Sequence, residues 1–135
     1  MKKIFLLVDD DQDDADLFAE AVEELQHLVE YQYVPSARDL FRFLENRQPQ
    51  SKLAIFLDIN MPAVNGWECL AQLKAVDAYK HIPVIIYTTS ESPQDAKKAT
   101  QSGAYGFVTK PDRFKVLVDM LENIAKGSIF NTTEY

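Results

Sequence analysis

Six aspartates fall in the eight positions from Asp9 to Asp16, directly after an apolar run at residues 4–8. Two carboxylates 5 Å apart repel by roughly 3 kcal/mol at an effective dielectric of 20. Carboxylates that end a buried strand therefore need a cation, whereas those in the first turn of a helix are stabilised by its dipole. We assign Asp9 and Asp10 to the group that needs a cation. The start of the helix accounts for the others: Asp11, Asp13, Asp14 and Asp16.

Three further polar residues, Asp58, Thr88 and Lys110, each come directly after another apolar run. Clustered carboxylates suit Mg²⁺, which prefers oxygen ligands and keeps coordination sites for water and phosphate. A lysine and a hydroxyl can hold the oxygens of a phosphoryl group, and an aspartate can become an acyl phosphate. The residue types therefore predict a magnesium-dependent phosphoryl-transfer site.

These residues can meet only if the apolar runs are neighbouring parallel strands. Continuous runs at residues 4–8, 53–57 and 84–87 are typical of strands buried on both faces of a sheet. The shorter, alternating run at residues 31–34 suits an edge strand, and residues 104–109 give a fifth strand. In such a sheet the ligand site lies at the carboxyl ends of the strands, where the polar residues follow.

Amphipathic stretches separate the strands and predict five helices. Ser36 with Asp39 resembles a capping box. Ser92 before Pro93 predicts an N-cap and a first-turn proline, and Gly103 fits the position after that helix. A third helix is predicted around position 67, where Trp67 lies, and residues 112–126 are predicted to form the fifth helix. The predicted apolar faces of the first and last helices are Leu17, Phe18, Ala21, Val22, Leu25 and Leu28, and Phe114, Leu117, Val118, Leu121 and Ile124.

The alternation of strand and helix predicts one α/β domain with a doubly wound, five-stranded parallel sheet. We expect this domain to occupy residues 1–127, with residues 128–135 as a short tail and no output domain. The net charge of −7 argues against nucleic-acid binding through phosphate neutralisation. The single cysteine, Cys69, and the lack of an apolar run of about 20 residues predict a cytoplasmic protein without a membrane segment.

Four motifs give the chain a specific resemblance to a response-regulator receiver domain of the stand-alone type, similar to the chemotaxis response regulator. The resemblance runs from Lys3 to about Lys126 and implies the flavodoxin-like strand order 2-1-3-4-5. The motifs are Val8-Asp-Asp10, Leu57-Asp-Ile-Asn-Met-Pro-Ala-Val-Asn-Gly66, Pro83-Val-Ile-Ile-Tyr-Thr88 and Thr109-Lys-Pro111.

The resemblance implies that Asp58 is the phosphoacceptor and one of the ligands of a magnesium ion. Asp10 corresponds to the direct metal ligand, and Asp9 to the acid that acts through water. Asn60 is expected to add its backbone carbonyl to the metal. Asp11 remains a rival ligand if the register shifts by one residue.

The resemblance also implies that Thr88 and Lys110 bind the phosphoryl oxygens, with Thr89 as the rival for the hydroxyl. Phe107, three residues before Lys110, matches the switching aromatic of the family, although a static core aromatic is equally compatible with the sequence. The Lys110–Pro111 bond corresponds to a cis peptide in the family, a conformation that proline makes accessible.

The function implied is two-component signalling: Mg²⁺-dependent transfer of a phosphoryl group from a phosphohistidine to Asp58. The donor is a sensor histidine kinase or a histidine phosphotransfer protein, and the protein phosphorylates and dephosphorylates itself rather than turning over a substrate. Phosphorylation switches the face of helix 4, strand 5 and helix 5 for a partner, a homodimer or onward phosphorelay. A haloacid-dehalogenase-like phosphatase is disfavoured because Asn60 stands where that family needs an acid. A receiver fold that has lost phosphorylation is disfavoured by the complete residue set.

Overall fold

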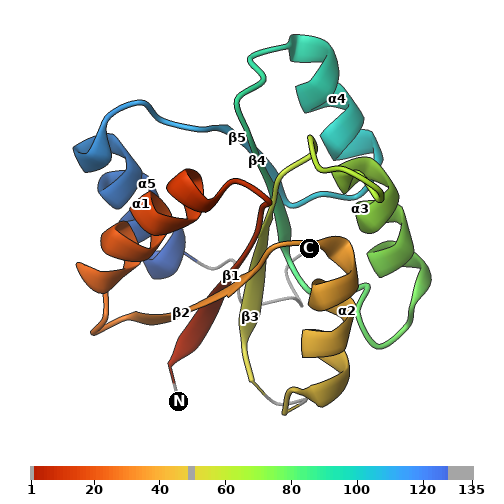
Figure 1. Ribbon diagram of the computed structural model, residues 1–135, viewed down its shortest axis with the longest axis horizontal. Coiled ribbons are helices and arrows are strands. Elements are labelled where there is room, and N and C mark those ends of the chain that lie inside the picture. Colours follow the sequence, from red (N-terminus) through yellow and green to blue (C-terminus); the bar gives the residue numbers. More distant parts are fainter. Residues whose placement is uncertain (1, 49–50, 128–135) are drawn as a thin grey trace.

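The computed structural model describes residues 2–48 and 51–127, so the predicted tail at 128–135 lies outside the described residues. Five strands alternate with five helices along this part of the chain (Figure 1). The elements are β1 (Lys3–Val8), α1 (Gln12–Glu23), β2 (Val29–Val34), α2 (Ala37–Asn46), β3 (Leu53–Leu57), α3 (Gly66–Ala75), β4 (Val84–Thr88), α4 (Pro93–Gln101), β5 (Gly106–Thr109) and α5 (Phe114–Lys126).

The strands form one sheet in the order β2-β1-β3-β4-β5, and every neighbouring pair is parallel. This confirms the predicted flavodoxin-like order. Helices α1 and α5 cover one face of the sheet, and α2, α3 and α4 cover the other (Figure 1). Val8 at the end of β1 pairs with Leu57 at the end of β3, and Thr88 at the end of β4 pairs with Thr109 at the end of β5. The strands therefore finish at a common edge.

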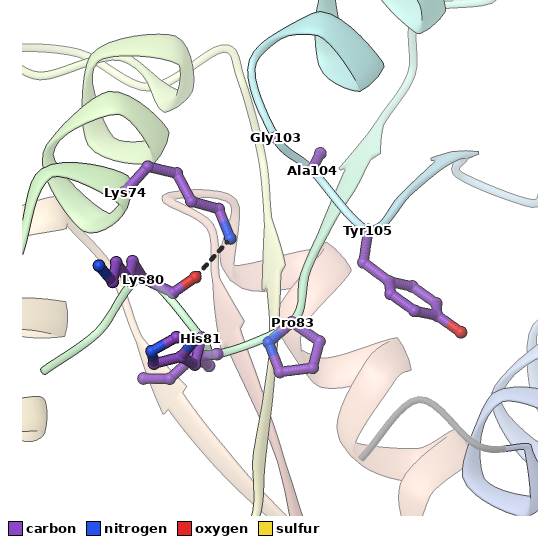
Figure 2. Close-up of a pocket in the computed structure, with 8 residues that line it drawn as sticks. Lys74, Lys80, His81, Pro83, Gly103, Ala104 and Tyr105 are labelled. Carbon is purple, nitrogen blue, oxygen red and sulfur yellow. Dashed lines mark hydrogen bonds between the residues drawn. The ribbon is translucent and has the colours of Figure 1, made fainter. Parts of the chain in front are cut away.

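The opposite edge, at the amino ends of β4 and β5, contains a cavity of about 570 Å³ (Figure 2). The Lys74 ammonium of α3 lies in it and donates a hydrogen bond to the Lys80 carbonyl oxygen at 3.1 Å. The cavity is lined by Lys74, Lys80, His81, Ile82, Pro83, Gly103, Ala104 and Tyr105. None of these lining residues is an aspartate or a glutamate.

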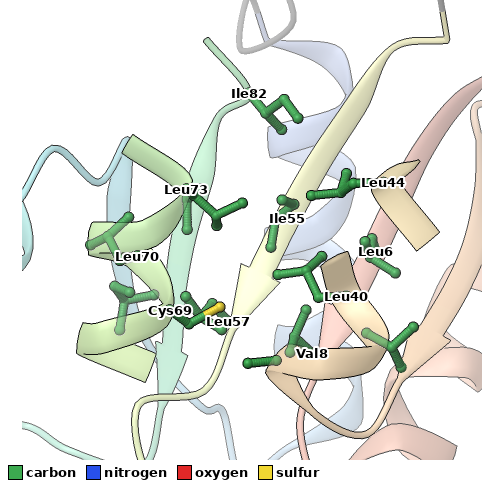
Figure 3. Close-up of a cluster of buried hydrophobic side chains, with 14 of the residues drawn as sticks. Leu6, Val8, Leu40, Leu44, Ile55, Leu57, Cys69, Leu70, Leu73 and Ile82 are labelled. Carbon is green, nitrogen blue, oxygen red and sulfur yellow. The ribbon is translucent and has the colours of Figure 1, made fainter. Parts of the chain in front are cut away.

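Alternate residues of β3 pack into separate hydrophobic clusters on the two faces of the sheet. Ile55 and Leu57 pack with residues of α2 and α3 (Figure 3), whereas Ala54 and Phe56 pack with residues of α1 and α5. All five residues of β3 are buried. Burying a large aliphatic or aromatic side chain contributes about 1.5–3 kcal/mol. The continuous apolar run thus marks a strand with both faces covered.

The sequence signals for helix starts are confirmed at α1 and α2. Asp11 is the N-cap of α1, and its side chain accepts hydrogen bonds from the backbone N–H groups of Asp13 and Asp14. The Ser36 hydroxyl accepts from the backbone N–H of Asp39 and donates to its carboxylate. Capping of this kind stabilises a helix by about 1 kcal/mol. Asp11 therefore serves the helix start, as its position in the sequence indicated.

Helix α4 also begins and ends at the predicted residues. Ser92 accepts hydrogen bonds from the backbone N–H groups of Gln94 and Asp95, and Pro93 occupies the first turn. Gly103 follows the helix with φ of +90°, in the left-handed region that glycine adopts most readily.

The first and last helices differ from the prediction. Helix α1 ends at Glu23, because tight turns that include the Leu25 to Val22 and Leu28 to Leu25 hydrogen bonds carry the chain into β2. Leu17 is 49% exposed and Phe114, the first residue of α5, is 39% exposed, so their assignment to the buried faces was wrong. Leu17 precedes the fully buried Phe18, and successive residues of a helix point about 100° apart.

The predicted cis bond between Lys110 and Pro111 is also wrong. Every peptide bond in the described part of the chain is trans. The trans form of a bond to proline is favoured by about 0.5–1 kcal/mol when nothing else selects the cis form. The backbone N–H of Lys110 donates to the Thr88 carbonyl oxygen at 2.6 Å, so the lysine is tied to the end of β4 with its following bond trans.

Candidate functional site

The pairing of β1 with β3 brings the predicted acidic residues together. The backbone N–H of Asp58 donates to the Val8 carbonyl oxygen at 3.0 Å, so Asp9 and Asp58 leave adjacent strands side by side. One carboxylate oxygen from each of Asp9, Asp10 and Asp58 lies within 4.8 Å of the other two. Three residues from two separate parts of the sequence thus form one acidic cluster at the carboxyl edge of the sheet.

Asp9 is the most buried member of this cluster, with no exposed surface. Burial raises the pKa of its carboxyl group to about 6, and the Asp58 charge adds to the rise, while the Lys110 ammonium and the Asp11 N–H oppose it. Its Oδ1 accepts a hydrogen bond from the Asp11 N–H at 2.9 Å. Its Oδ2 is buried and has no hydrogen bond of good geometry among the described residues, although the Lys110 ammonium lies 2.8 Å away.

This donor set fits a hard divalent cation. All of its side-chain donors are carboxylate oxygens, one of which is buried without a well-directed hydrogen bond. Asp10 is exposed, so the cluster opens to solvent on one side, as an ion that keeps several water ligands requires. The backbone N–H of Asn60 donates to Asp58 Oδ1 at 3.1 Å and so fixes the orientation of that carboxylate.

Lys110 supplies the positive charge of the site. Its ammonium lies 2.7 Å from Asp14 Oδ2, 2.8 Å from Asp9 Oδ2 and 3.8 Å from Asp58 Oδ2, and its side chain is 9% exposed. Burial by itself lowers the pKa of this ammonium, but the close contacts with the Asp14 and Asp9 carboxylates outweigh burial, and the pKa is raised. Lys110 is therefore charged at any physiological pH and partly balances the carboxylates.

The sequence did not predict that two residues, Asp14 and Tyr87, belong to this site. Asp14 had been assigned to the start of α1 only, and its contact with Lys110 depends on how α1 is oriented against the end of β5. The ring of Tyr87 lies beneath the Lys110 ammonium, 5.6 Å from ring centroid to nitrogen. Tyr87 was part of an apolar run, and an alternation pattern alone cannot reveal such a cation–π contact.

Thr88 ends β4 and is fully buried, whereas Thr89 is exposed. The Thr88 hydroxyl accepts a hydrogen bond from the Ser90 N–H at 3.2 Å. The Ser90 carbonyl oxygen accepts from the Thr109 hydroxyl at 2.8 Å, and the Ser90 hydroxyl donates to Asp95 Oδ2 at 2.6 Å. Ser90 thereby connects the end of β4 to β5 and to the first turn of α4.

The loop after Asp58 returns so closely that only glycine fits at position 66. A Cβ atom on Gly66 would lie 2.5 Å from the Ile59 Cα and would collide with the Asp58 carbonyl oxygen. The backbone N–H of Gly66 donates to the Ile59 carbonyl oxygen at 3.2 Å. The start of α3 is thus packed directly against the backbone that carries Asp58.

Phe107 lies on β5, is half-buried and packs against the cluster on the α2, α3 and α4 side of the sheet. Separately, none of the helices in the described ranges is long and apolar enough to cross a bilayer.

Comparisons with known proteins all point to the same protein family. The model of the response regulator receiver domain matches residues 5–122. The probable methanogenesis regulatory protein FilR2 of Methanothrix harundinacea is 31% identical over 124 residues, which cover 90% of this chain and 80% of that protein. The chemotaxis protein CheY of Halobacterium salinarum is 30% identical over 124 residues, which cover 92% and 98%.

Some relatives are much longer than this chain. Solved structures of other response regulators have the same fold. This chain spans 32% of the probable transcriptional regulator ycf29 of Pyropia yezoensis, with 40% identity over 70 residues. The Mn²⁺-bound form of the response regulator Rcp1 is 27% identical, with a TM-score of 0.71 over 90% of this chain and 91% of that one. Because the family model spans most of the sequence and the sheet has the strand order expected of it, the chain belongs to the response regulator receiver domain family and acts in two-component signal transduction.

Proposed function

We propose that Asp58 accepts a phosphoryl group from the phosphohistidine of a sensor histidine kinase or a histidine phosphotransfer protein. The observation that carries this assignment is that the Asp58 carboxylate belongs to the acidic cluster with Asp9 and Asp10 and also lies 3.8 Å from the Lys110 ammonium. Asp58 is 5% exposed, so its carboxylate is largely desolvated yet reachable from the open side of the site. Asp9 is fully buried, which leaves Asp58 as the better placed nucleophile.

In the transfer step a carboxylate oxygen of Asp58 forms a bond to phosphorus, and the bond from phosphorus to the donor imidazole nitrogen breaks. The imidazole nitrogen keeps the electron pair of the broken bond. Lys110 and the Thr88 hydroxyl bind oxygens of the transferred group, and the Asn60 N–H keeps the Asp58 carboxylate oriented. Mg²⁺ held by Asp9, Asp10, Asp58 and the Asn60 carbonyl supplies further positive charge when bound. Later, water attacks phosphorus, the bond from phosphorus to the Asp58 oxygen breaks, and inorganic phosphate leaves the restored carboxylate.

Phosphorylation then changes the face made by α4, β5 and α5. The Thr88 hydroxyl accepts from the Ser90 N–H and keeps its own O–H to donate to a phosphoryl oxygen, so a movement of Thr88 toward that oxygen would be passed to Ser90 through this hydrogen bond. Ser90 is bonded to β5 and α4, so this movement reaches both elements. Rotation of Phe107 would follow the movement of Thr88, and the altered face would bind a protein partner, a second copy or a phosphorelay protein.

The single cysteine, Cys69, is a buried free thiol, which suits a cytoplasmic protein.

Intact mass after incubation with a small acyl-phosphate donor tests the assignment. The wild-type protein should gain one phosphoryl group in the presence of Mg²⁺ and none with EDTA. Asp58→Asn should gain none under either condition, because an amide is not a competent nucleophile here. Phosphoryl uptake by Asp58→Asn would refute the choice of Asp58. Rapid donor consumption without any adduct on the protein would favour a phosphatase instead.

A further inference from the structure

Lys110 is shared unequally among three carboxylates. Its ammonium is about one ångström nearer to Asp14 and Asp9 than to Asp58, at 2.7 and 2.8 Å against 3.8 Å. The bond to Asp14 joins residues 96 positions apart and connects the first turn of α1 to the end of β5. In the unphosphorylated protein the lysine is therefore drawn toward α1 and away from the proposed phosphoacceptor.

Asp14 and Asp9 differ in what happens when Lys110 moves away. Asp9 is fully buried, so loss of its counter-charge leaves an uncompensated buried carboxylate. The Asp14 side chain is 30% exposed and lies in the first turn of α1, where water and the helix dipole stabilise a carboxylate without the lysine. Asp14 also lies outside the acidic cluster that fits a cation. Asp14 can therefore release Lys110 without another cation to replace it, whereas Asp9 needs one.

We propose that Asp14 is a positioning residue that holds Lys110 in the unphosphorylated state and releases it to a phosphoryl group on Asp58. This inference rests on the proposed function. A phosphoryl group carries more charge and more acceptor oxygens than a carboxylate, so it competes successfully for the ammonium. Because the Asp14 bond must be broken first, Asp14 stabilises the unphosphorylated state and weakens the binding of any tetrahedral anion at Asp58.

The test uses fluoroberyllate, a tetrahedral anion that bonds to a carboxylate oxygen and mimics a phosphoryl group. Its dissociation constant is measured in Mg²⁺ for the wild type, Asp14→Ala and Asp13→Ala. Asp13 is the matched control, because it lies in the same turn and is exposed, and its carboxylate has no contact with Lys110 in the described structure. Asp14→Ala should bind about tenfold more tightly than Asp13→Ala, the factor set by one charge-assisted hydrogen bond. Asp13→Ala should stay within about twofold of the wild type.

A second readout separates positioning from a purely structural role. In metal-free protein labelled with ¹⁵N-lysine, the Lys110 ammonium resonance should move in Asp14→Ala and stay in place in Asp13→Ala. Thermal unfolding should show Asp14→Ala to be no more stable than Asp13→Ala, so tighter anion binding with equal or lower stability cannot come from a better fold. If an alanine variant fails to fold, Asp14→Asn and Asp13→Asn give the same comparison.

Equal fluoroberyllate affinity in the two variants, or weaker binding by Asp14→Ala, would overturn the role of Asp14 while leaving Asp58 as the phosphoacceptor. Absence of both fluoroberyllate binding and a phosphoryl adduct in the wild type would overturn the proposed function and this inference together. The wild-type measurement therefore tells the two failures apart.

Discussion

Asp9 shows how far a single side chain can depart from the behaviour of its residue type. Its carboxylate ends a fully buried strand, and burial lifts its pKa from 3.8 to about 6 in spite of the Lys110 ammonium beside it. Asp10 is exposed at the open side of the cluster, and the remaining acids of the Asp9 to Asp16 segment cap α1 or lie within it, nearer to water. One residue step thus separates a desolvated acid from solvated ones.

The raised pKa of Asp9 predicts a pH dependence of stability in the metal-free protein. Between about pH 4 and pH 6 the folded state binds more protons at Asp9 than the unfolded state, so stability from this group is lost as pH rises through that window. The loss amounts to about 3 kcal/mol. Urea unfolding in EDTA at several pH values should show Asp9→Asn gaining on the wild type as pH rises from 4 to 7. A difference between the two proteins that does not change with pH would show that the pKa of Asp9 is not raised.

At the scale of the residue, the sequence identified side chains whose role follows from strand position. Asp9, Asp10 and Asp58 each follow the end of a buried strand, and parallel pairing is enough to bring them together. Asp14 and Tyr87 were missed because their contacts with Lys110 depend on the rotation of α1 and on the height of the lysine above β4. Neither the rotation of a helix nor the position of a side chain above a strand can be predicted from residue spacing.

At the scale of the element, the contact between α3 and the end of β3 is the tightest constraint around Asp58. Gly66→Ala should destabilise the protein by about 1–3 kcal/mol, because the new Cβ meets backbone atoms of Asp58 and Ile59 that have little room to move. Gly127→Ala is the matched control, since a Cβ there lies 3.4 Å from its nearest neighbour and should change stability by less than about 0.5 kcal/mol. Urea unfolding of the three proteins measures both values, and equal midpoints for the two variants would contradict the argument.

Elements were predictable where local chemistry decides them. The strand at residues 53–57 and the start of α4 at Ser92 and Pro93 follow from a continuous apolar run and from capping preferences. The faces of α1 and α5 were less predictable, because Leu17 and Phe114 are apolar yet exposed, and periodicity cannot define the edge of a buried stripe to one residue. The end of α1 was missed because residues 24–28 form turns with apolar residues at helical spacing.

At the scale of the whole molecule, the alternation of strands and helices predicted the architecture, and a resemblance supplied the strand order. Physical rules alone leave several orders open, since parallel strands joined by right-handed crossovers can be wound in more than one way. The resemblance also supplied the cis bond before Pro111, which the fold does not contain. The family pattern therefore predicted the strand order correctly. It did not predict the isomer of the bond before Pro111, where the cis and trans forms differ by only about 1 kcal/mol.

A divalent cation should stabilise the whole domain through its acidic edge. The chain carries a net charge of −7, and three of its carboxylates converge at one point. An ion that binds only the folded state at 100 times its dissociation constant stabilises it by about 2.7 kcal/mol. Mg²⁺ should therefore raise the unfolding midpoint of the wild type, and Asp10→Asn should lose most of that gain because it removes a carboxylate from the cluster.

Asp11→Asn is the neighbouring control for this experiment. It removes the same charge one residue away, but Asp11 caps α1, and asparagine caps a helix about as well as aspartate. The gain in stability from Mg²⁺ should survive in Asp11→Asn. If Asp11→Asn loses the gain and Asp10→Asn keeps it, the cation is bound one residue further along the chain than the geometry of β1 and β3 places it. The two substitutions thus connect the stability of the whole domain to the register of one strand end.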